Sequence, residues 1–234
     1  MNQKNISRLG FWVSILIALA TIAAFALAIT LAPARSGPNC PPLVEMGVID
    51  SCVTYPYTDV AAYVPTEYIW MYPAVLVAML LVVLAVCIHY SAPVEKKLAS
   101  QLALSFAAIS AAVHTINYFI QLTVMQPSLL KGELEYLSLF SQYNPHGVFI
   151  ALEDLGYFLM GIVFLLIAIA LPKRDRLEKS IRFILIAGAI VVIGGIVVMP
   201  LLLGVDLEYQ YEVLSLTVDW IVLIITGILF GVYF

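Results

Sequence analysis

The chain has 234 residues, of which 63% are hydrophobic and 11% are charged, and its formal net charge is −4. A soluble domain carries roughly 25% charged residues, so this composition excludes a water-facing globular surface, and it equally excludes disordered, collagen-like and solenoid chains. The acidic balance disfavours nucleic acid as a partner. We therefore expect an all-α, polytopic membrane protein whose surroundings are the lipid bilayer.

Six stretches are long and apolar enough to cross about 30 Å of hydrocarbon, which takes about 20 helical residues. In chain order they are 9–32, 68–90, 98–125, 148–171, 181–203 and 213–234. The first run is too long for a signal peptide, and Pro33-Ala34-Arg35 is a poor cleavage site, so we expect a retained helix. The sequence predicts one domain, 1–234, folded as a six-transmembrane-helix bundle.

The positions of Lys and Arg predict the orientation, because cytoplasmic loops carry an excess of both. Nine basic residues fall on one side of the predicted spans, and only Arg35 and Lys131 fall on the other. The nine are Lys4, Arg8, Lys96, Lys97, Lys173, Arg174, Arg176, Lys179 and Arg182. We therefore expect a multi-pass cell-membrane protein with both termini cytoplasmic and with segments 33–67, 126–147 and 204–212 outside.

The first outer loop contains two cysteines, Cys40 and Cys52. Thiols exposed to an oxidising environment tend to pair, and a disulfide here would close a loop of about a dozen residues, contributing on the order of 3 kcal/mol in the chain-entropy model. The sequence therefore predicts a structural disulfide within loop 33–67. Two free thiols are the alternative.

The second outer loop shows leucines at helical spacing, namely Leu130, Leu134 and Leu137. This pattern predicts a short helix over about 128–142, lying in the membrane interface and capped by Ser128. The segment is interpreted either as a packed lid over the helix ends or as a gate.

Polar side chains inside the spans mark the candidate site, because such groups are costly in hydrocarbon. Three spans contribute them, and those of span 98–125 fall within an arc of about 100°. The rise per residue predicts that they reach one level in the outer half of the bilayer. The candidate ligand- or proton-binding residues are His114, Asn117, Tyr118, Gln121, Glu153, Asp154, Tyr157 and Asp219.

The charge balance of this candidate site is unusual. No Lys or Arg lies in the deep part of any span, so the carboxyl groups lack their usual cationic partner, and His114 is the one candidate base. Either at least one carboxyl group carries a proton at neutral pH, or a cation, a basic ligand, a metal ion or water completes the site. Each residue also has a structural interpretation, as a packing histidine, an amide that ties helices together or an interfacial tyrosine.

Three functions are consistent with these features. The leading hypothesis is a protein that binds or translocates a small cationic or hydrogen-bonding solute, with or without proton coupling. The second is an intramembrane enzyme that acts on a lipid-like substrate with a carboxylate and His114 as its acid–base pair. The third is a non-catalytic accessory subunit of a homo- or hetero-oligomer. The last span ends at Phe234 without a flanking basic residue, so we expect either a truncated chain or a contact with another subunit there. No phosphate loop, HExxH or CxxC motif is present, so no cofactor or metal is predicted.

Overall fold

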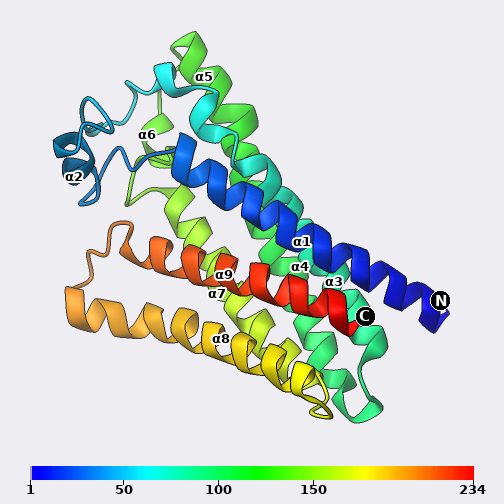
Figure 1. Ribbon diagram of the computed structural model, residues 1–234. Coiled ribbons are helices and arrows are strands. Elements are labelled where there is room, and N and C mark those ends of the chain that lie inside the picture. The colour runs from blue at the N-terminus through cyan, green and yellow to red at the C-terminus, as the bar shows by residue number, and fades with distance from the viewer. Residues whose placement is uncertain (1) are drawn as a thin grey trace.

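The computed structural model describes residues 2–234, which form helices and no strands. Six helices are long and apolar enough to cross a membrane, which confirms the predicted all-α architecture of an integral membrane protein. They are α1 (Gln3–Leu31), α3 (Met71–Ser91), α4 (Lys97–Ile120), α7 (Val148–Ala170), α8 (Arg176–Leu203) and α9 (Gln210–Tyr233). Both chain ends lie at the same end of the bundle (Figure 1).

Local signals explain where the long helices begin and end. Asn2 caps α1 by accepting a hydrogen bond from the Lys4 amide, and Asp175 caps α8 by accepting one from the Glu178 amide at 2.9 Å. Helix α3 ends just before Pro93, and a proline also follows the end of α7. Proline disfavours the helical conformation in the residue that precedes it, so each of these two helices ends just before its proline.

Five of the six long helices pack as a ring, and the sixth, α8, lies on its flank. Helix α1 contacts α3 and α9, α4 contacts α3 and α7, and α7 contacts α9; α8 packs against both α7 and α9 (Figure 1). Large apolar side chains fill the interior, among them Ile17, Leu81, Phe164, Trp220 and Phe230. Other apolar side chains remain exposed on the outer faces of the same helices, as expected where the surroundings are lipid.

The segment after α4 differs from the sequence prediction. Helix α4 continues through a π-helical stretch, η4 (Gln121–Met125), into α5 (Gln126–Lys131), and a second short helix, α6 (Leu137–Phe140), follows. Gly132 ends α5 in the left-handed conformation, φ 71°, which glycine adopts without steric cost. Residues 128–142 therefore hold the end of one helix and a separate short one, instead of the single interfacial helix that the leucine spacing predicted.

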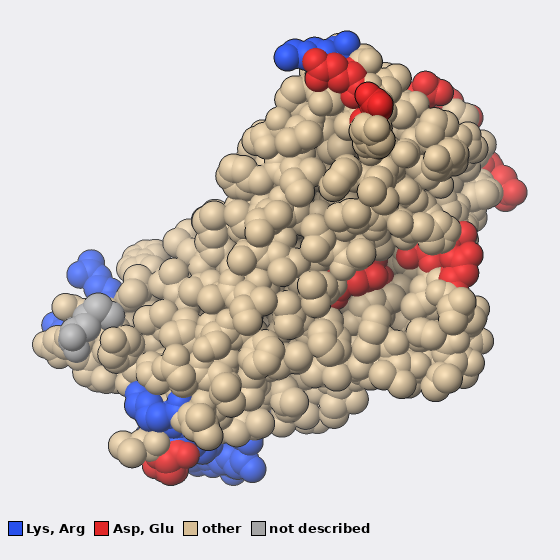
Figure 2. Space-filling view, turned by 180° about the vertical axis from the view of Figure 1, so that it is seen from behind, with Lys and Arg blue, Asp and Glu red and all other residues tan. Residues whose placement is uncertain are grey.

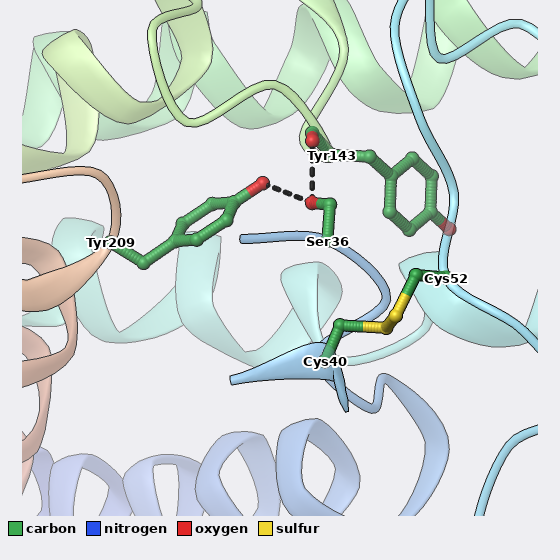
Figure 3. Close-up of a disulfide and its surroundings, with 5 residues drawn as sticks. All are labelled: Ser36, Cys40, Cys52, Tyr143 and Tyr209. Atoms are coloured by element: carbon green, nitrogen blue, oxygen red, sulfur yellow. Dashed lines mark hydrogen bonds between the residues drawn. A yellow bond between two sulfur atoms is a disulfide. The ribbon is translucent and has the colours of Figure 1, made fainter. Parts of the chain in front are cut away.

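The loops on the side of the bundle away from the termini are fastened to one another. The disulfide Cys40–Cys52 is present, which confirms the predicted pairing, and it joins the start of α2 (Cys40–Glu45) to the loop that follows (Figure 3). Ser36 donates a hydrogen bond to the Tyr143 carbonyl at 2.6 Å and lies 2.7 Å from the Tyr209 hydroxyl. Three loops distant in sequence thus meet at one serine.

A separate small cluster of apolar side chains lies beneath these loops. Its buried members are Val60, Met125, Leu129, Leu137 and Tyr143. They come from the loop between α2 and α3, from η4, from α5 and α6 and from the segment before α7. This cluster packs the loops against the extended α4–α5 helix.

The contact between α1 and α9 depends on a glycine. A Cβ atom added at Gly227 would lie 2.9 Å from the Ser14 carbonyl oxygen and 3.0 Å from the Ala18 Cβ. Neither neighbour can rotate away, so we expect Gly227→Ala to lower the free energy of unfolding by at least about 1 kcal/mol. Gly194→Ala is the matched control, because nothing lies within 4 Å of its added Cβ; it should leave stability unchanged or raise it by about 0.5–1 kcal/mol.

Unfolding of both glycine variants by SDS titration in mixed micelles, followed by circular dichroism, measures this difference. Equal stabilities of the two variants would show that α1 and α9 do not approach this closely.

Candidate functional site

A cavity of about 190 Å³ lies between the ends of α1, α7 and α9 that are nearest to the fastened loops. The polar and aromatic side chains in its lining are Arg35, Ser36, Asn39, Glu67, Trp70, Gln142, Tyr143, Phe149, Glu153, Tyr209 and Glu212. Figure 2 shows acidic side chains in a hollow of the surface, whereas Lys and Arg gather mainly at the opposite end of the molecule. The hollow end of the bundle is therefore acidic.

Two carboxyl groups from different helices meet in the cavity. Glu153 on α7 is only 1% exposed, and its Oε1 accepts a hydrogen bond from the Tyr118 hydroxyl at 2.7 Å. Glu212, in the first turn of α9, is partly buried, and its carboxyl group neighbours that of Glu153. Within residues 2–234 neither glutamate forms an ion pair with Lys, Arg or His. The cavity thus contains two adjacent acidic groups without a basic partner.

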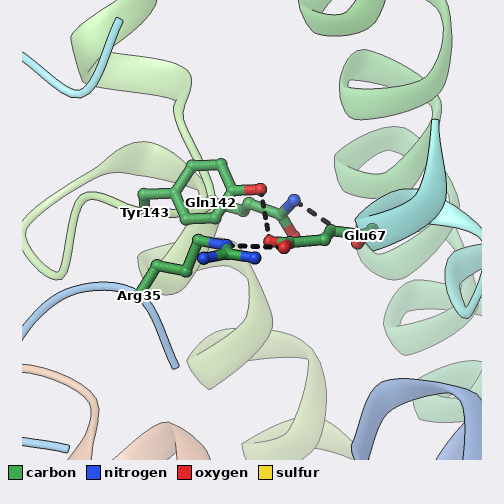
Figure 4. A network of polar contacts seen from close by, with 4 residues as sticks. All are labelled: Arg35, Glu67, Gln142 and Tyr143. Atoms are coloured by element: carbon green, nitrogen blue, oxygen red, sulfur yellow. Dashed lines mark hydrogen bonds and ion pairs between the residues drawn. The ribbon is translucent and has the colours of Figure 1, made fainter. Parts of the chain in front are cut away.

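A third glutamate in the lining has its basic partner. The Arg35 Nε lies 2.5 Å from Oε1 of Glu67, and the Tyr143 hydroxyl donates to Oε2 at 2.8 Å (Figure 4). The Arg35 guanidinium also lies 3.6 Å from the centroid of the Tyr63 ring, a cation–π arrangement. Both carboxylate oxygens of Glu67 are therefore occupied by groups of the protein itself.

The tyrosines that border the cavity from the loops contribute no charge. Burial raises the pKa of the Tyr143 hydroxyl well above its usual range, and burial likewise raises the pKa of the Tyr209 hydroxyl. Both phenols therefore stay protonated at physiological pH. The charge of the cavity depends on its three glutamates and Arg35.

The polar stripe of α4 faces the interior, as its periodicity predicted, but it mainly joins two helices. The Asn117 amide donates to the Phe149 carbonyl of α7 at 2.9 Å, and the Gln121 amide, in η4, donates to the Phe140 carbonyl at 2.6 Å. Neither side chain is in the lining of the cavity. Of the α4 candidates, Tyr118 alone reaches a carboxyl group of the cavity.

His114 is buried against α7 and also lies outside the lining of the cavity. Its Nδ1 lies 3.0 Å from the Ser110 carbonyl of its own helix, and its ring contacts that of Tyr157 with 4.6 Å between centroids. Its Nε2 has no hydrogen-bond partner among residues 2–234. A Cβ at Gly156 would lie 2.5 Å from the ring, so the imidazole occupies the space that this glycine leaves.

The two candidate aspartates are not part of the cavity lining. Asp219 on α9 is fully buried, 0% exposed, and neither of its carboxyl oxygens has a hydrogen-bond partner in the described chain. Asp154 on α7 is partly exposed, and its Oδ1 is likewise without a partner. The structure thus joins Tyr118 and Tyr157 to Glu153 by hydrogen bonds, but of the sequence candidates only Glu153 is in the lining of the cavity.

Three charged residues of the cavity lining were not among the candidates identified from the sequence, namely Arg35, Glu67 and Glu212. The spacing of seven residues between Glu212 and Asp219 does place both on one helix face, so Glu212 could have been identified. Arg35 and Glu67 belong to segments without periodicity at the ends of loop 33–67, and no pattern in the sequence predicts that they meet.

Comparison of the chain with protein-family models, curated proteins and solved structures finds no match. Function is therefore inferred from the geometry and charge of the cavity.

Proposed function

We propose that this integral membrane protein binds a small organic cation in the cavity bordered by Glu67, Glu153 and Glu212. Binding in this cavity is the first step by which the protein translocates the cation. The observation that carries this proposal is the adjacent, unpaired position of Glu153 and Glu212, which come from different membrane-spanning helices. Two neighbouring carboxyl groups in a site of low dielectric constant cannot both ionise without strong mutual repulsion. A cation placed between them relieves that repulsion and supplies the missing opposite charge.

The lining favours an organic cation. Within the described chain, no three His, Cys, Asp or Glu residues come together in a way that could hold a metal ion. The rest of the lining includes aromatic and aliphatic side chains, among them Trp70, Phe149 and Leu216. Aromatic faces attract ammonium groups, and apolar walls accommodate a hydrocarbon body. A small alkylammonium ion combines both features.

The distribution of charge supports an outward-facing cavity. Lys96 and Arg182 both donate to the Leu171 carbonyl at the end of α7 that lies away from the cavity, and most other basic residues lie at the same end (Figure 2). Under the positive-inside rule this end, which also carries both termini, is cytoplasmic. The cavity then opens toward the outside of the cell membrane.

A hydrogen-bonded chain supports coupling to protons. The Tyr118 hydroxyl donates to Glu153 and lies 3.0 Å from the Tyr157 hydroxyl, which is deeper along α7. Such a chain connects the cavity with the interior of the bundle, where Asp219 lies near Tyr157.

The alternative hypothesis of an enzyme is less well supported, because His114 bonds its own helix and forms no hydrogen bond with a carboxyl group in the described chain. The cavity itself disfavours a purely structural subunit.

Titration of the purified protein in lipid nanodiscs with butylammonium, followed by isothermal calorimetry, tests the proposal. 1-Butanol has the same length and no charge, and empty nanodiscs correct for partition into lipid. We expect saturable binding of butylammonium, with 1-butanol at least about tenfold weaker because it lacks the interaction with the carboxylates. Equal binding of the two compounds, or binding no stronger than to empty nanodiscs, would contradict the proposed function.

A further inference from the structure

We propose that Arg35 determines the charge of the ligand, so that the cavity accepts a cation with one positive charge in preference to one with two. This inference rests on the proposed function of the cavity and adds a specificity-determining residue to it. Arg35 belongs to the loop that follows α1 and is in the lining of the cavity together with all three glutamates.

Arg35 acts as a built-in cation. Its guanidinium is held on one side by the Glu67 carboxylate at 2.5 Å and on another by the Tyr63 ring at 3.6 Å. The side chains of Arg35 and Glu67 are 14% and 4% exposed, so water screens this pair little. An aromatic face and a carboxylate are the two groups that recognise an organic cation, and here a residue of the chain uses both (Figure 4).

The pairing of Glu67 leaves one place in the cavity where an ammonium group can meet carboxyl groups without a basic partner, beside the neighbouring Glu153 and Glu212. Its two oxygens accept from Arg35 and from the Tyr143 hydroxyl, so Glu67 is not available to a ligand. The first ammonium group of a ligand is matched by Glu153 and Glu212, which lack a basic partner. A second ammonium group would meet the occupied Glu67 and the positive charge of Arg35, and both effects oppose its binding.

The structural alternative is that the ion pair only anchors the loop. Anchors independent of this pair are present next to it, since Ser36 bonds Tyr143 and Tyr209, and Cys40 is linked to Cys52. A pure anchor predicts that loss of the pair lowers stability without changing which ligand charge is preferred. Charge selection predicts a change in preference whose direction depends on which partner is removed.

Calorimetry in nanodiscs with butylammonium and putrescine separates these alternatives, because putrescine carries an ammonium group at each end of the same four-carbon chain. The measured quantity is the Kd of putrescine divided by the Kd of butylammonium. Arg35→Gln exposes Glu67 to the ligand and should lower this ratio at least about tenfold. Glu67→Gln leaves Arg35 as an unpaired cation and should raise the ratio by a similar factor.

The double variant R35Q/E67Q is the matched control, because it removes one charge of each sign and restores the original net charge. Its ratio should return to within about threefold of the unmodified protein. Ratios that are equal in the unmodified protein, R35Q and E67Q, with butylammonium still bound, would overturn charge selection and leave the proposed function standing. Absence of butylammonium binding to the unmodified protein would overturn both. If R35Q does not fold, the opposite shift expected of E67Q decides the question.

Discussion

Replacing Glu212 by Gln should weaken the binding of butylammonium at least about tenfold, and Glu153→Gln should have an effect of similar size. Two unit charges 4 Å apart interact with about 4 kcal/mol at the effective dielectric constant of a partly buried site. Loss of even a third of that interaction changes Kd about tenfold. Both substitutions keep the size of the side chain, so the shape of the cavity is preserved while its charge falls.

Stability distinguishes this loss of binding from a loss of folding. Because Glu153 and Glu212 neighbour each other and neither has a basic partner, replacing either by an amide removes the cost of burying two adjacent acidic groups. Thermal unfolding of E153Q and E212Q in the same nanodiscs should therefore occur at an unchanged or a higher temperature. A protein that binds less and unfolds no earlier has lost an interaction with the ligand.

Glu45→Gln provides the matched control for net charge. Glu45 is exposed at the end of α2 and is not in the lining of the cavity. Its neutralisation changes the charge of the protein by the same amount and should leave the Kd of butylammonium within about twofold at physiological ionic strength, because salt and water screen an exposed charge that does not contact the ligand. Equal weakening by E45Q and E212Q would indicate a general attraction of cations to the acidic face and would contradict a specific site.

Asp219→Leu should raise the free energy of unfolding by about 2–3 kcal/mol, because an acidic residue deep in a membrane span is costly. Asp219 is fully buried, and both of its oxygens lack a partner in the described chain. The hydroxyls of Tyr157 and Tyr211 are close enough to interact with it electrostatically, but neither donates a hydrogen bond to it. Leucine is of similar size and removes the unpaired polar atoms.

Thr226→Val on the same helix is the control for loss of a satisfied polar group. The Thr226 hydroxyl donates to the Val222 carbonyl at 2.6 Å, so its replacement by an isosteric apolar side chain should change stability by no more than about 1 kcal/mol. SDS titration of both variants in mixed micelles measures the two effects. A lower free energy of unfolding in D219L than in the unmodified protein would contradict this prediction. It would show that Asp219 has hydrogen-bond partners, such as buried water.

Binding of butylammonium to D219L gives a second, independent readout. Because Asp219 is not in the lining of the cavity, the Kd should remain within about twofold of that of the unmodified protein. A carboxyl group that lowers the free energy of unfolding and does not contact the ligand, as expected of Asp219, is consistent with a proton-binding role in coupled translocation. A large loss of binding in D219L would instead place Asp219 in contact with the ligand.

Several features of the protein were determined by the sequence alone, because each follows from a local or periodic property. Hydropathy over about 20 residues predicts the membrane spans, since the thickness of the hydrocarbon sets their length. Helical periodicity correctly predicted that His114, Asn117 and Gln121 face the interior. The disulfide was predictable because Cys40 and Cys52 share one short loop.

The composition of the cavity was decided only by the tertiary structure. The sequence places Glu153 and Asp219 at one level, but α9 begins at Gln210 and Asp219 lies about two turns deeper than Glu212, so Glu153 and Glu212 line the cavity and Asp219 does not. Arg35 and Glu67 lie at opposite ends of one loop, and their ion pair depends on the path that the fastened loops take. A pattern along one helix carries no information about which neighbour that helix meets, because packing between helices depends on all of them at once.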